Sequence, residues 1–149
     1  MYNVLEICSY IINYSNEKEY DISNLKLQKL LYFIQVYFLI KNNEPCFEEK
    51  IEAWDFGPVV PIAYNQYKQY GSMNIPPVTM YIDRFGNNPY QIKRIEYDDI
   101  YISKDDRKMI NEVIDKLADY TATDLVAITQ NQTPWREVHK DDQHNEITH

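Results

Sequence analysis

Hydrophobic side chains recur at helical spacing in the first third of the chain and predict two helices. The first apolar stripe lies close to the N-terminus and consists of Val4, Leu5, Ile7, Cys8, Ile11 and Ile12. The second helix is predicted over residues 24–41, directly after Ser23, which suits an N-cap position. Apolar residues occupy most sides of this second helix. A helix of that kind is expected to be buried at the centre of a domain.

The middle of the chain alternates between turn residues and short extended segments. Residues 50–54 alternate polar and apolar side chains, which indicates a brief strand. Pro61 suits the first turn of a helix, and Gly71 suits its end. Segments 78–82 and 90–95 are rich in β-branched and aromatic residues, so we expect a hairpin or a small antiparallel sheet there.

The last third of the chain is predicted to be helical after one more short strand at residues 100–102. Ser103 begins a capping-box pattern that opens one helix, and Thr121 begins a second such pattern before a shorter helix. Pro134 suits the start of a final helical turn. Residues 139–149 are polar, and we expect a frayed tail there.

These elements define an α+β fold that is predominantly helical. We expect about five to six helices around a buried central helix, together with a small antiparallel β-hairpin or sheet. A chain of 149 residues is long enough for one domain with a real core and too short for two comfortable ones. A single domain over residues 1–149 is therefore expected.

The net charge of the chain indicates which classes of partner it can bind. The formal net charge is −8, and lysines and arginines are scattered along the sequence. Nucleic acid is disfavoured as a partner, because binding to phosphates needs a basic face. A basic protein partner fits the charge better. The chain shows neither a signal-peptide pattern nor an apolar run long enough to span a membrane, so we expect a cytoplasmic protein.

Few residues are arranged for catalysis or metal binding. The three glycines form no phosphate-binding loop, and all three histidines lie in the last eleven residues. Cys8 and Cys46 are far apart in sequence and form no metal-binding pair. Cys8 is interpreted as a core residue, and Cys46 is expected in an exposed loop. No catalytic residue, metal or cofactor is predicted.

The least generic segment is 54–61, with two aromatic residues, one carboxylate, one glycine and two prolines. Gly57 permits an unusual backbone conformation and the prolines stiffen the chain, so we expect a rigid corner. Trp54 and Phe56 are expected on opposite sides of it. The residues alone favour a structural role, in which the corner positions the following helix against the core. The alternative is that the corner presents a fixed surface to a partner. Only Asp55 within it is a candidate for chemistry.

Three segments resemble motifs of the Panacea-domain family, also called SocA-like or phage-associated proteins. Residues 24–33 are similar to the helix with the pattern LQKLLYF, and residues 52–64 are similar to the segment EAW..GPVVP..Y. Residues 129–135 are similar to a short motif of the form TH.E.PW. Gln130 and Gln132 replace a histidine and an acidic residue of that motif, which removes proton chemistry or metal binding there but permits hydrogen bonding.

The resemblance implies a non-enzymatic antitoxin that neutralises a toxin, either directly or as an adaptor for a Clp-type protease. Such proteins are commonly encoded in prophages and mobile elements. A partner-binding surface is then the functional site. Its candidate residues are Lys29, Tyr32, Trp54, Asp55, Phe56, Gly57, Pro58, Tyr64, Tyr67 and Trp135.

Two other function classes stay open from the residues. One is a small hydrolase or transferase centred on Asp55, which requires a concave pocket around that carboxylate. The other is a phage-associated regulator that binds nucleic acid, which the net charge of −8 opposes. The identity of the partner, the oligomeric state and the role of residues 78–102 do not follow from the sequence.

Overall fold

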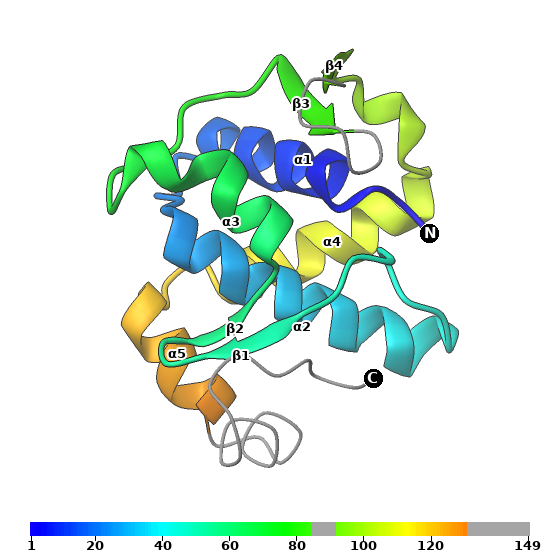
Figure 1. Cartoon of the computed structure of the whole chain (residues 1–149). Coiled ribbons are helices and arrows are strands. Elements are labelled where there is room, and N and C mark those ends of the chain that lie inside the picture. The colour runs from blue at the N-terminus through cyan, green and yellow to red at the C-terminus, as the bar shows by residue number, and fades with distance from the viewer. Residues whose placement is uncertain (85–91, 131–149) are drawn as a thin grey trace.

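The computed structural model describes residues 1–84 and 92–130 (Figure 1). Its helices are α1 (Val4–Glu17), α2 (Asn24–Asn42), α3 (Pro61–Tyr67), α4 (Lys104–Lys116) and α5 (Ala122–Gln130), with short 3₁₀ helices η1 (Lys68–Tyr70) and η2 (Asp99–Tyr101). Its strands are β1 (Glu52–Trp54), β2 (Gly57–Val59), β3 (Met80–Arg84) and β4 (Ile92–Glu96). The strands form two antiparallel hairpins, β1–β2 and β3–β4. The predicted α+β, mainly helical fold is confirmed, with two hairpins instead of one.

Helix α2 is the centre of the molecule. It runs through the middle of the view in Figure 1 and contacts α1, α3, α4, α5 and strand β2. Leu27, Leu30, Leu31 and Ile34 lie in the core along one face of this helix, and Lys29 and Tyr32 are buried on another. The prediction of a central helix over residues 24–41 is confirmed, and Ser23 caps it by accepting a hydrogen bond from the Lys26 N–H (3.2 Å).

Buried polar side chains of α2 fix the chain that follows it. Gln35 accepts hydrogen bonds from the N–H groups of Cys46 (2.7 Å) and Phe47 (3.2 Å), and it donates to the Phe47 carbonyl (2.8 Å). Gln28 accepts from the N–H of Val60 (2.9 Å). Each buried amide therefore has partners, as burial requires. The segment between α2 and α3 is pinned to α2 at both ends.

Cys46 is buried, so the prediction of an exposed cysteine was wrong. The physical reason is the bond from its backbone N–H to Gln35, which draws this loop against the core. Burial also raises the pKa of the Cys46 thiol.

Tyrosines on or near α1 bind the polar side of α4. The Tyr10 hydroxyl donates to Asn111 Oδ1 (2.6 Å), and the hydroxyls of Tyr14 and Tyr20 donate to Asp115 at 2.8 and 3.0 Å. A tyrosine placed at the edge of a core buries its ring and keeps its hydroxyl hydrogen-bonded. Part of the large tyrosine content of the chain therefore serves packing between helices.

The predicted strand at residues 100–102 was wrong. The chain forms η2 there, because the Asp98 side chain accepts a hydrogen bond from the Ile100 N–H (3.1 Å) and closes a local turn. Both predicted caps around it are present. Ser103 accepts from the Asp106 N–H (3.1 Å), and Thr121 exchanges two bonds with Asp124.

The predicted turn at Pro134 and the tail at 139–149 lie outside the described residues.

Candidate functional site

Residues 52–59 form the β1–β2 hairpin, not the predicted corner. Trp54 pairs with Gly57 and Ala53 pairs with Pro58, so Asp55 and Phe56 alone make the turn. Strand β2 lies against α2 and α5 and is buried along its whole length. The hairpin therefore has an inner strand that packs on the helices and a turn that reaches the surface.

Gly57 sits where no other residue fits well. Its φ is +95°, a conformation that side chains with a Cβ resist. A Cβ at this position would also lie 3.0 Å from Thr129 Oγ1 and 3.1 Å from Lys29 Cε. The glycine thus allows β2 to approach two helices closely, because it has neither strain nor bulk at this point.

Lys29 is completely buried beneath the hairpin. Its ammonium donates a hydrogen bond to the Pro58 carbonyl (2.9 Å) and lies 5.9 Å from the ring centroid of Phe56. Burial lowers the pKa of Lys29 to about 7, because a charged ammonium is costly away from water. This lysine joins α2 to β2 and lies directly behind the turn.

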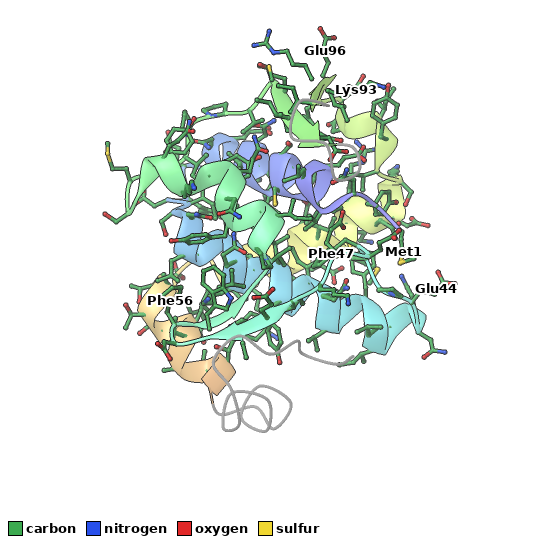
Figure 2. All side chains as sticks on the ribbon, viewed as in Figure 1. Met1, Glu44, Phe47, Phe56, Lys93 and Glu96 are labelled. Atoms are coloured by element: carbon green, nitrogen blue, oxygen red, sulfur yellow. The ribbon has the colours of Figure 1, made fainter. Side chains whose placement is uncertain are left out.

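Three aromatic rings meet at the surface of the hairpin. The ring of Trp54 packs edge-to-face against Phe56 (centroids 5.8 Å apart) and against Tyr64 of α3 (5.1 Å). The indole N–H of Trp54 donates to Glu52 Oε1 (3.0 Å). We call Trp54, Phe56 and Tyr64 the aromatic patch. Figure 2 labels Phe56 at the edge of the molecule, beside the β1–β2 turn.

The expectation that Trp54 and Phe56 lie on opposite sides was wrong. Phe56 occupies the turn itself, where the chain reverses and side chains no longer alternate as they do along a strand. Its ring folds back against Trp54 and is 41% exposed.

The structure separates the predicted site residues into two groups. Trp54, Asp55, Phe56 and Tyr64 are exposed or half-buried around the hairpin turn. The others that are described lie inside the molecule, so they do not form part of its surface: Lys29, Tyr32, Gly57, Pro58 and Tyr67. Trp135 lies outside the described residues.

The sequence interpretation missed two residues of this region. Thr129 of α5 is buried against Gly57, and Glu52 holds the indole of Trp54. Both lie inside the segments that resemble family motifs, at the first position of the third motif and the first position of the second. Their positions within these motifs were the signal by which the sequence could have identified both residues.

The hydrolase or transferase hypothesis requires a concave pocket around Asp55, but its side chain is exposed at the turn. Two pockets lined by described residues, of about 570 and 620 Å³, lie elsewhere: one is lined mainly by α3 and β3, the other by the start of α2 and residues 118–122. An exposed carboxylate outside these two pockets does not support the catalytic role considered for Asp55.

Residues 1–84 and 92–130 hold no cluster of three or more potential metal ligands. In the same residues, no helix combines the length and the apolar character that crossing a bilayer requires.

The three motif-like segments of the sequence meet at one point of the fold. Lys29 comes from the first, Gly57 from the second and Thr129 from the third, and the side chains of Lys29 and Thr129 both lie beside Gly57. The fold and this contact define a small, mainly helical domain that presents a short aromatic hairpin on a buried lysine.

The chain belongs to the family described as Antitoxin SocA-like, Panacea domain, whose sequence model matches residues 27–136. It is also similar to the protein named Antitoxin SocA of Caulobacter vibrioides (strain NA1000 / CB15N), with 37% identity over 65 residues. That alignment covers 44% of this chain and 35% of the Caulobacter protein, so the chain matches about a third of this relative. No solved structure matches the chain significantly.

Proposed function

We propose that this protein is an antitoxin that neutralises a partner toxin by binding it directly through the aromatic patch. Membership of the Antitoxin SocA-like family supports the antitoxin role. The observation that carries the proposed site is the exposed, edge-to-face cluster of Trp54, Phe56 and Tyr64 on the β1–β2 hairpin. The protein acts by recognition in the cytoplasm and carries out no chemistry of its own.

The aromatic patch has the physical properties of a binding anchor. Aromatic side chains supply most of the binding free energy at many protein interfaces, because each covers a large apolar area with few rotatable bonds. Trp54 is held by two neighbouring rings and by its bond to Glu52. Trp54 therefore loses little side-chain entropy when a partner covers it.

The test is co-expression with the protein encoded by the neighbouring reading frame. We expect that protein to stop growth when expressed alone, and we expect this chain to restore growth and to co-purify with it. Phe56→Ala should weaken the complex by roughly 30-fold or more, as truncation of a central aromatic anchor does. The matched control is Ile40→Ala, which shortens an apolar side chain that is 76% exposed near the end of α2. Unchanged binding after Phe56→Ala would place the interface elsewhere.

The same experiment separates direct neutralisation from delivery to a protease. Rescue of growth is expected also in a strain that lacks its Clp-type protease, because binding alone blocks the toxin. Rescue that disappears in this strain, with toxin levels rising, would identify the protein as a protease adaptor instead.

A further inference from the structure

We infer that the segment that binds the aromatic patch is cationic: an apolar stretch of the partner that carries arginine or lysine next to the patch. The inference rests on the proposed function and adds the chemistry of the partner's surface to it.

Two carboxylates border the rings of the patch directly. Glu52 accepts the indole N–H of Trp54, and Asp55 lies between Trp54 and Phe56 in the exposed turn. The patch is therefore an apolar surface with an acidic edge.

The buried lysine does not offset this charge for a partner. Lys29 lies behind Phe56, has no exposed surface, and donates a hydrogen bond inward to the Pro58 carbonyl. Its lowered pKa, about 7, also leaves the ammonium only partly charged near neutral pH. Among the described residues of the hairpin turn, the groups beside the rings are therefore the carboxylates of Glu52 and Asp55.

Such a surface suits a guanidinium better than any other side chain. The planar guanidinium of arginine pairs with carboxylates through two hydrogen bonds and also stacks on aromatic faces. Indole gives the strongest attraction to a cation among the aromatic rings. An acidic partner segment would instead place its carboxylates against Glu52 and Asp55, and like charges that face each other oppose binding.

The experiment removes the two carboxylates without touching the rings. The double variant Glu52→Gln, Asp55→Asn keeps the shape of both side chains and removes two negative charges. The matched control is Glu96→Gln, Asp105→Asn, which removes two exposed carboxylates from β4 and α4. Figure 2 labels Glu96 at the end of the molecule opposite Phe56. The probe is the purified product of the neighbouring reading frame, and binding is measured at low and high salt.

We expect the hairpin variant to bind about tenfold more weakly at low salt, mainly through slower association, and to lose most of the salt dependence of binding. The control variant should stay within about twofold of the native protein at low salt. Equal binding by the native protein and the hairpin variant, or tighter binding by the variant, would overturn the cationic partner while leaving the proposed interface intact. If no complex forms with the native protein, the proposed function fails and the inference fails with it.

Discussion

Lys29 makes the stability of this protein depend on pH in an unusual direction. Its pKa is about 7 in the folded protein, and its ordinary value is 10.5. Between these two values the unfolded chain binds a proton that the folded chain does not bind. Unfolding therefore takes up a proton, and the free energy of unfolding rises as the pH rises through this window.

The size of the effect follows from the shift. A fall of the pKa from 10.5 to about 7 corresponds to a total change on the order of 5 kcal/mol across the whole window. Between about pH 7.5 and pH 8.5, where most of Lys29 is already neutral in the folded state, we expect the free energy of unfolding to rise by roughly 1 kcal/mol. Below pH 7 the lysine is protonated in both states, and its contribution no longer changes with pH.

The measurement is urea unfolding of native protein and of Lys29→Met at several pH values in this window. Methionine keeps most of the length of the side chain and cannot be protonated, so the variant should lose the slope. The control is Lys41→Met, an exposed lysine in the last turn of α2, which should keep it. The window stops below pH 9, because burial raises the pKa of Cys46 above its ordinary value of 9.0, and stability falls as unfolded thiols ionise beyond that point.

The test depends on how the free energy of unfolding changes with pH, and not on the absolute stability of the variant. Lys29→Met removes a costly buried charge, but it also leaves the buried Pro58 carbonyl without its hydrogen bond, at a cost of about 1–3 kcal/mol. Below pH 10.5 these two changes oppose each other, because burying or neutralising the lysine costs free energy there. A native protein without the slope, or a Lys29→Met variant that retains it, would refute the account of Lys29 as a neutralised buried amine.

Two further predictions concern the packing that holds the hairpin. Gly57→Ala should destabilise the protein by roughly 2–4 kcal/mol in thermal or urea unfolding, because the new Cβ meets atoms near 3.0 Å and the residue keeps a positive φ. The control Gly71→Ala should cost less, because Gly71 also has a positive φ but nothing lies within 4 Å of its Cβ position. Equal costs of the two substitutions would argue against the close approach of β2 to the helices. Gln35→Ala removes three buried hydrogen bonds and should cost roughly 3–6 kcal/mol, whereas Gln69→Ala at an exposed position should stay within about 0.5 kcal/mol. A small effect of Gln35→Ala would mean that water replaces its bonds.

The sequence predicted those parts of the fold whose pattern is local. The second helix was placed at residues 24–41, and the structure has Asn24–Asn42, because a run of leucines between a serine cap and a polar turn determines a helix with little help from the rest of the chain. The caps at Ser103 and Thr121 were found for the same reason. The single domain over residues 1–149 stays a prediction.

The errors fall where a contact between distant residues decides the outcome. Cys46 is buried because Gln35, on the preceding helix, binds its backbone. Phe56 folds back onto Trp54 because two strands pair around a two-residue turn, and alternation along the sequence does not show where a turn begins. No local pattern showed that Lys29 is buried under a hairpin, since lysines at helix surfaces are usually solvated.

The buried contact of Lys29, Gly57 and Thr129 explains why the aromatic patch has a fixed shape. A two-stranded hairpin is marginally stable alone, and a slip of its register by one residue would turn every side chain to the opposite face. Lys29 binds one carbonyl of β2, and only a glycine fits beside Thr129, so a single register satisfies both contacts. That register places Trp54 against Tyr64 and leaves Phe56 at the surface. The rings proposed to bind a partner are thus positioned by buried residues that lie outside the proposed interface.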